Sequence, residues 1–161
     1  MYIKQNSTLL SRKKNMQLKK YTDYGLRVLM YLACQPAQAM TSVRVICEVF
    51  DISANHVNKV VHHLAKIELI ETRRGKHGGF MLAKPVEDIP LDFVIRQLEG
   101  DEEWIECHSP YCVALPACTL NSIVGQGKTL FYKHLSKFTV ADLVTNNKAE
   151  LQQIFIVNAP A

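Results

Sequence analysis

A chain of 161 residues is long enough for one ordinary domain, or for a small domain with an appendage. Hydrophobic residues make up 48% of it, a share typical of globular proteins, which excludes a wholly disordered chain. No apolar run approaches the roughly 18 residues that span a bilayer, and the opening segment lacks the pattern of a signal peptide. We therefore expect a cytoplasmic protein.

The charge is distributed unevenly along the chain. Residues 1–90 contain 14 Lys and Arg against 7 Asp and Glu, a net charge of +7. Residues 91–161 contain 5 against 8, a net charge of −3, which gives +4 overall. A basic surface favours polyanions because binding releases their condensed counterions. The charge directs the search for a nucleic-acid site to the first half.

The first segment and the first helix differ sharply in character. Residues 1–15 are polar and basic and show no helical periodicity. Met16 reads as a plausible start, so we expect residues 1–15 to be a disordered N-terminal extension. Dense apolar positions in residues 24–34 predict a buried helix, with Thr22 or Asp23 as its cap.

Two further helices, at residues 43–50 and 54–66, are separated by a turn of about three residues. Thr41 or Ser42 starts the first, and Ser53 is well placed to cap the second. Apolar residues of the second helix recur at i, i+3, i+4 and i+7, the spacing of a buried stripe: Val57, Val60, Val61 and Leu64. This pattern predicts a helix-turn-helix, whose second helix reads DNA.

Polar residues occupy the exposed face at the start of that second helix. Asn and Lys suit base edges, because Asn pairs with adenine and Lys with guanine. The alternative is an ordinary solvated helix face. The position at the start of the motif's second helix favours DNA contact, and the predicted set is Ser53, Asn55, His56, Asn58 and Lys59.

Two short strand-like runs follow, at residues 69–73 and 79–83, with a glycine-rich turn between them. A hairpin after a helix-turn-helix is a wing, and we assign residues 16–85 to a winged helix-turn-helix domain. Basic side chains at a wing tip suit phosphates or the minor groove, although a merely soluble turn is the alternative. The predicted DNA contacts of the wing are Arg73, Arg74, Lys76 and His77.

The second half contains more helical patterns. Residues 91–98 repeat the apolar stripe and Gly100 ends that helix. A longer pattern covers about residues 120–138, although Gly125 and Gly127 each weaken it by about 1 kcal/mol relative to Ala. We expect such a helix to pack closely against a partner such as a second subunit.

The last residues complete the predicted fold. Thr139 caps a short helix at 140–144, and residues 146–161 form a C-terminal tail. The chain is thus predicted to be mainly α with a small β-hairpin wing. Its architecture is a winged helix-turn-helix followed, in residues 86–145, by a cysteine loop and a long C-terminal dimerisation helix.

Five cysteines are an unlikely disulfide framework for a cytosolic protein. Cys34 and Cys47 lie in apolar helical patterns and behave as core residues. Cys107, Cys112 and Cys118 instead share one short loop with C-x4-C-x5-C spacing. Thiolates in such a loop select zinc, copper(I) or iron–sulfur clusters. Zinc remains open here, although zinc fingers usually pair cysteines at shorter gaps.

Several motifs together give the chain a family resemblance. They are L-x-x-Y-T-D-Y-G-L-R at 18–27, Asn55, His56 and Lys59, R-G-K-H-G-G-x-x-L at 74–82, the three cysteines of the loop, and A-D-L-V at 141–144. With this combination, over nearly all of residues 16–145, the chain resembles the iron–sulfur winged-helix regulators of the Rrf type. Within that family it is similar to the nitric-oxide-sensing repressors.

The resemblance implies a homodimer with one iron–sulfur cluster, 4Fe-4S or 2Fe-2S, in each subunit. The implied ligands are Cys107, Cys112 and Cys118, with Asp23 donated from the partner's first helix. Asp23 is otherwise an ordinary helix-start carboxylate. Arg27 lies four residues after Asp23 on the same helix face. One interpretation is an ordinary i, i+4 ion pair, and the other is a pair that links the state of the cluster to the geometry of the dimer.

The implied function is that of a DNA-binding transcriptional repressor, which nitric oxide releases from a pseudo-palindromic operator. No enzyme motif is present, so we do not expect catalysis. One alternative is a regulator that senses zinc or thiol redox state through the same cysteines. Another is a small iron–sulfur electron carrier. Iron and sulfide content separates the first from a cluster protein, and operator binding separates both regulators from the carrier.

Overall fold

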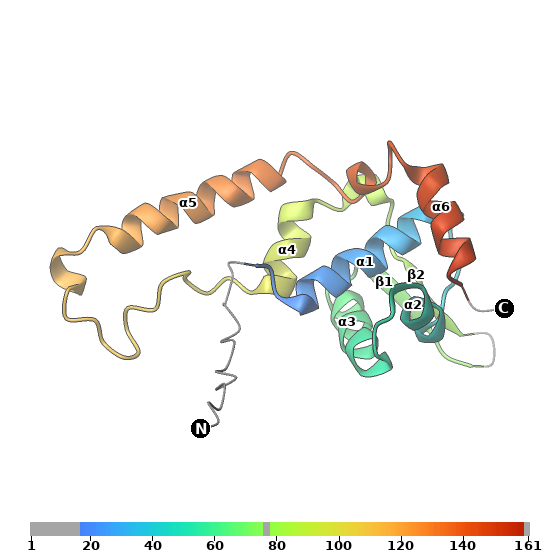
Figure 1. Cartoon of the computed structure of the whole chain (residues 1–161), viewed down its shortest axis with the longest axis horizontal. Helices are drawn as coiled ribbons and strands as arrows, with labels where there is room; N and C mark the ends of the chain where they lie inside the picture. The colour runs from blue at the N-terminus through green and yellow to red at the C-terminus, as the bar shows by residue number, and fades with distance from the viewer. Residues whose placement is uncertain (1–16, 76–77, 160–161) are drawn as a thin grey trace, which may run out of the picture.

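The central element is helix α1 (Lys20–Cys34), on which α2, α3, α4, α6 and β2 all pack. Its second half is almost wholly apolar, and Val28, Leu29 and Cys34 have no exposed surface. In the first half, Gly25 allows α4 to approach closely. A Cβ at this position would overlap the Leu98 side chain of α4. Figure 1 shows α1 crossing the middle of the computed structural model, which describes residues 17–75 and 78–159.

The helix-turn-helix forms as predicted. Helix α2 (Val43–Phe50) begins with Ser42, whose Oγ accepts a hydrogen bond from the Val45 N–H at 3.4 Å. Asp51 ends it with a left-handed backbone, φ +50°, which turns the chain into α3 (Ala54–Lys66). The predicted apolar stripe of α3 is buried against the core: Val57, Val60, Val61 and Leu64.

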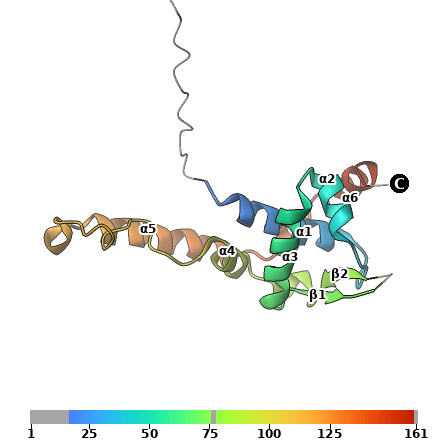
Figure 2. The same cartoon turned by 90° about the horizontal axis from the view of Figure 1, so that it is seen from below.

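The wing is the antiparallel hairpin β1 (Ile70–Arg73) and β2 (Gly79–Leu82), with Ile70 opposite Leu82. Thr41 extends it as an isolated bridge, exchanging two 2.9 Å backbone hydrogen bonds with Phe80. These bonds attach the wing to the segment that precedes α2. Figure 2 shows the strands of the hairpin beside α3, at the end of the molecule opposite to α5.

The chain then crosses to α4 (Leu91–Glu99) after a single 3-10 turn, η1 (Val86–Asp88). Beyond α4, residues 100–119 form a long loop that includes the turn η2 (Leu115–Ala117) and leads into α5 (Leu120–Leu135). Figure 1 shows α5 and this loop extending away from the remaining elements. Tyr132 is the one residue of α5 that is fully buried.

The segment after α5 returns to the core. Leu91 N–H donates to Phe138 O and Val140 N–H to Ile89 O, both at 2.9 Å. The turn η3 (Ala141–Leu143) follows, and then α6 (Lys148–Val157) packs on α1. The hydrophobic core therefore draws on residues from both ends of the chain.

The predicted fold class is confirmed, but several local predictions were wrong. Neither Thr22 nor Asp23 caps α1: the helix begins at Lys20, and the Glu99 carboxylate of α4 accepts the Lys19 N–H at 3.0 Å. Ser53 is the N-cap residue of α3, as predicted, but its Oγ lies 2.8 Å from His56 Nδ1 and makes no capping hydrogen bond to the backbone.

The end of the chain also differs from the predictions. The expected helix at 140–144 is only the turn η3, and the expected tail contains α6. The N-terminal extension, Lys76 and His77 lie outside the described residues. Among the helices that are described, none is long and apolar enough to cross a membrane.

Phe155 attaches α6 to the rest of the fold. Its ring lies 5.3 Å from that of Tyr31 and 5.4 Å from that of Phe50, and its side chain is buried. Phe155→Ala should lower the free energy of unfolding by about 3–5 kcal/mol, because it removes a buried aromatic ring. Urea denaturation measures this. The control is Val157→Ala, at an exposed position of α6, which should change stability by less than about 0.5 kcal/mol.

His63 makes stability depend on pH. Burial, and then the positive charges of Lys66 and His62, lower the pKa of His63 below its ordinary value. Its Nδ1 lies 3.0 Å from the Tyr21 hydroxyl. The folded state favours the neutral imidazole of His63. The stability that this group contributes is therefore complete above about pH 6.5, and it is lost as the pH falls through the lowered pKa. His63→Gln should flatten the stability profile below about pH 6.5; an unchanged profile contradicts this.

Candidate functional site

The predicted recognition surface lies on the exposed side of α3. Ser53, Asn55, His56, Asn58 and Lys59 are all exposed, whereas the intervening Val57 is buried. This follows from helical periodicity, since residues three and four apart share a face. The structure thus brings the five predicted residues onto one accessible helix surface.

Helix α1 supports this surface from behind. The Tyr24 ring lies 5.6 Å from the His56 ring, and the Ser53 hydroxyl lies 2.8 Å from His56 Nδ1. One turn further along, the Tyr21 hydroxyl donates to the Lys59 carbonyl at 3.2 Å. The orientation of the recognition helix is therefore set in part by tyrosines from the first turns of α1.

Arg73 and Arg74 of the wing are both exposed to solvent. Gly75 has φ +112°, a conformation that favours glycine, and Gly78 N–H donates to its carbonyl at 2.9 Å. A Cβ on Gly78 would overlap the Arg73 carbonyl. These glycines allow the tight reversal that presents the two arginines.

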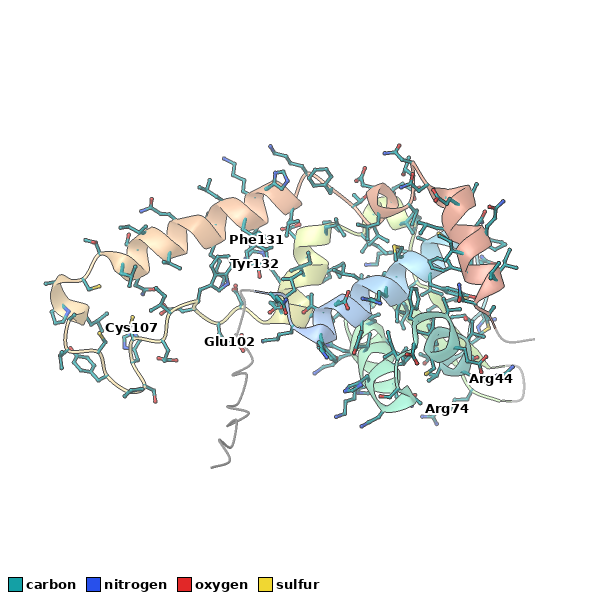
Figure 3. All side chains as sticks on the ribbon, viewed as in Figure 1. Arg44, Arg74, Glu102, Cys107, Phe131 and Tyr132 are labelled. Atoms are coloured by element: carbon teal, nitrogen blue, oxygen red, sulfur yellow. The ribbon has the colours of Figure 1, made fainter. Side chains whose placement is uncertain are left out.

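Arg44 is a candidate contact that the sequence predictions missed. It lies in the first turn of α2, its side chain is 69% exposed, and Glu48 is 3.9 Å away. Figure 3 shows Arg44 and Arg74 on the same side of the molecule. The position of Arg44 in the motif could have identified it from the sequence, because the first helix of a helix-turn-helix crosses the DNA backbone.

The cysteine loop is held by its own backbone. Cys112 N–H donates to the Cys107 carbonyl at 2.9 Å, which closes a small hairpin. The Glu106 carboxylate accepts the N–H groups of His108 and Ser109 at 2.9 and 3.0 Å, and these bonds lower the pKa of Glu106. Cys107 is buried, Cys112 is half-buried and Cys118 is exposed.

The Cys107 thiol lies in a buried and negatively charged environment. Burial raises the pKa of Cys107, followed by the negative charges of Cys112, Glu103, Cys118 and Glu106. The thiols do not converge in this state: within residues 17–75 and 78–159, no three His, Cys, Asp or Glu side chains are gathered as metal ligands. Three thiols on one loop nevertheless form the donor set that suits a soft metal centre, because metal binding replaces the protons.

Asp23 is separate from the cysteines within one chain. Figure 1 shows the cysteine loop at the outer end of α5, away from α1. The Asp23 carboxylate is held by Arg27 through both oxygens, at 3.0 Å to Nε and 2.9 Å to the terminal nitrogen. Both side chains are partly exposed. The predicted Asp23–Arg27 pair is therefore present.

Comparisons with known proteins agree on the kind of protein this is. Residues 18–146 match the Rrf2 family, described as an iron-dependent transcriptional regulator. A relative from Oceanobacillus iheyensis, "HTH-type transcriptional regulator NsrR", is 43% identical and covers 83% of this chain and 92% of its own length. The regulator of the same name from Shouchella clausii is 42% identical, over 81% of this chain and 90% of its own.

Solved structures share the fold. CymR of Staphylococcus aureus superposes with a TM-score of 0.63 at 25% identity, over 78% of this chain and 95% of its own. IscR of T. potens gives a TM-score of 0.65 at 23% identity, over 82% and 88%. Because the curated relatives are transcriptional regulators, the expectation that this protein is not an enzyme is confirmed. The family match and the curated relatives together show that the chain belongs to the Rrf2 family of helix-turn-helix transcriptional regulators.

Proposed function

We propose that this protein is a nitric-oxide-responsive repressor, controlled by an iron–sulfur cluster that Cys107, Cys112 and Cys118 hold. The observation that carries the proposal is a loop of three cysteines in a chain that also presents a recognition helix and a wing. The similarity to regulators named NsrR supports the nitric oxide signal. A DNA-binding regulator acts where the chromosome is, so the protein belongs in the cytoplasm.

The functional unit is a homodimer formed through α5. Leu120, Ile123 and Leu130 are 54–65% exposed along this helix. Isolated helices of about this length are marginal in water, so α5 needs a partner surface. Added Cβ atoms at Gly125 and Gly127 would meet nothing within 4 Å, which leaves room for the close approach of a second α5.

In this dimer the fourth cluster ligand is Asp23 of the partner subunit, on the first turn of its α1. The bound cluster, 4Fe-4S or 2Fe-2S, supplies iron that reacts with nitric oxide. Arg27 would compete for the same carboxylate, because it now binds both oxygens of Asp23. Asp23 would have to leave Arg27 in order to hold a cluster, and both residues lie in the half of α1 that contacts α3.

The dimer binds an operator of two half-sites about one helical turn apart, the spacing expected for symmetry-related recognition helices. Asn55 and Lys59 contact base edges, and His56 and Asn58 assist them from the same face. Ser53 orients His56 through their 2.8 Å contact. The wing residues Arg73, Arg74, Lys76 and His77, with Arg44 of α2, contact phosphates or the minor groove.

Base contacts and phosphate contacts should respond differently to substitution. Asn55→Ala should weaken operator binding by about 1–3 kcal/mol and relax specificity at one base pair. Arg44→Ala should weaken operator and random DNA equally and reduce the salt slope by about one. Fluorescence anisotropy across a salt series measures both. Lys137→Ala, on an exposed residue beyond α5, is the matched control and should bind as wild type does.

The cluster proposal is tested on anaerobically purified protein by absorbance, iron and sulfide content, and operator binding during a nitric oxide titration. The expected result is a sulfide-to-iron absorption that bleaches in step with DNA release. Cys112→Ala should lose the absorption and the repression. Asp23→Ala should remain folded but alter cluster stability; an unchanged spectrum and nitric oxide response would remove Asp23 from the site.

Other outcomes identify the alternatives. A protein that contains zinc or free thiols, lacks iron and still binds the operator would be a zinc or thiol sensor. A protein with a cluster but no specific operator binding would be an electron carrier.

A further inference from the structure

The cysteine loop leaves α4 at a junction with α5. Gly100 ends α4 with φ +87°, and Asp101 and Glu102 begin the loop. Lys128, in the middle of α5, lies at this point. Its Nζ donates to the Asp101 carbonyl at 3.0 Å, the Asp101 carboxylate at 3.0 Å and the Glu102 carbonyl at 2.9 Å. All three N–H groups of the Lys128 ammonium therefore have acceptors on Asp101 and Glu102.

This contact differs from an ordinary surface ion pair. The Lys128 side chain is only 15% exposed, although the Asp101 side chain is 74% exposed. Two of its three acceptors are backbone carbonyls, so it fixes the path of the main chain as well as a side chain. Exposed lysine–carboxylate pairs usually contribute little because both side chains are mobile. The Lys128 ammonium is instead largely buried and has three acceptors, so it is held in one position.

Arg96 attaches the same junction to α4. Its guanidinium lies 3.6 Å from the Asp101 carboxylate and stacks on the Tyr132 ring, 3.7 Å from the ring centroid. Tyr132 is 1% exposed and is the buried anchor of α5. Asp101 thus lies between a cation of α4 and a cation of α5.

Further contacts continue along the loop towards the cysteines. Asn121 Nδ2 donates to the Glu103 carboxylate at 3.4 Å. The Trp104 ring lies 5.9 Å from the Phe131 ring. Figure 3 shows the chain running from Glu102 to Cys107 beside α5, with Phe131 and Tyr132 facing it. The loop therefore contacts α5 at each residue from Asp101 to Trp104.

We propose that Lys128 is a positioning residue that docks the start of the cysteine loop on α5 before any metal binds, and so restricts the path of the chain that leads to Cys107. The assignment of the thiols to a cluster rests on the function proposed above. A docked loop has already lost much of the conformational freedom that cluster binding would otherwise remove. Lys128 also offsets the repulsion within the acidic stretch before Cys107, and its hydrogen bond lowers the pKa of Asp101.

Trp104 is the only tryptophan of the chain, so its fluorescence reports docking directly. The test compares wild type, Lys128→Met and Lys133→Met in cluster-free form by acrylamide quenching. Lys128→Met keeps the aliphatic stem and removes the three donors. We expect its quenching to rise toward that of a free indole. Lys133 is also on α5 and exposed, so Lys133→Met should quench as wild type does.

The second measurement is the rate at which reconstituted protein loses iron to a chelator. Lys128→Met should lose it about tenfold faster, the size expected from lost charged hydrogen bonds. Lys128→Arg should recover part of the difference, because it restores a donor cation. Circular dichroism checks folding, and Asp101→Asn is the second variant: it keeps both carbonyl acceptors and should have an intermediate effect.

The outcomes separate this proposal from the function on which it rests. Wild-type quenching in cluster-free Lys128→Met, or an unchanged rate of iron loss, overturns the role of Lys128. A wild-type protein that never holds iron and sulfide overturns the proposed function instead. The quenching comparison then still decides whether Lys128 docks the loop.

Discussion

The burial of α1 is the constraint on which the rest of the structure depends. Its C-terminal half forms the centre of the core, so it cannot move independently of the elements around it. Its N-terminal half is held differently: Gly25 allows α4 to approach, and the Glu99 carboxylate accepts the Lys19 N–H and a hydrogen bond from the Thr22 hydroxyl. One helix therefore has a fixed end in the core and an end held by polar contacts to α4.

That polar end lies between the two candidate functional regions. Glu99 is the last residue of α4, directly before the junction where the cysteine loop starts. On the other side, Tyr21 and Tyr24 contact α3 at Lys59 and His56. A change in the cysteine loop thus has a short route of packed and hydrogen-bonded groups to the recognition helix. Such a route is a structural opportunity for coupling between the cysteine loop and α3.

The sequence predicted those features that depend on neighbouring residues. The stripe of Val57, Val60, Val61 and Leu64 identified α3, and the glycines between the strand-like runs identified the wing, because periodicity and turn chemistry are local. The cap of α1 was missed because Glu99 lies 80 residues from Lys19. Helix α6 was missed because it buries Phe155 alone and leaves Ile154, Ile156 and Val157 exposed, so it shows no apolar stripe.

Some residues of the candidate site could likewise be predicted from the sequence, and others could not. The three cysteines and the polar face of α3 were visible as patterns, whereas Lys128 looked like any lysine on a solvated helix. Its role depends on the path of the main chain at Asp101 and Glu102, which no spacing rule describes. Within one chain the cysteine loop lies away from α1, so a site that combines the cysteines with Asp23 is a feature of the proposed dimer, and contacts between subunits leave no pattern in a single sequence.

The change in operator affinity that regulation needs sets a minimum for the coupling free energy between the two regions. A thousandfold change in operator affinity requires about 4 kcal/mol of coupling. A single hydrogen bond contributes about 0.5–1.5 kcal/mol net, so loss of the Tyr21–Lys59 bond alone is insufficient. A response transmitted through α1 would therefore need several contacts to change together, such as those of Tyr21 and Tyr24 with α3 and that of Thr22 with Glu99. Because these residues lie on one helix whose other half is fixed in the core, a displacement of one would displace the others with it.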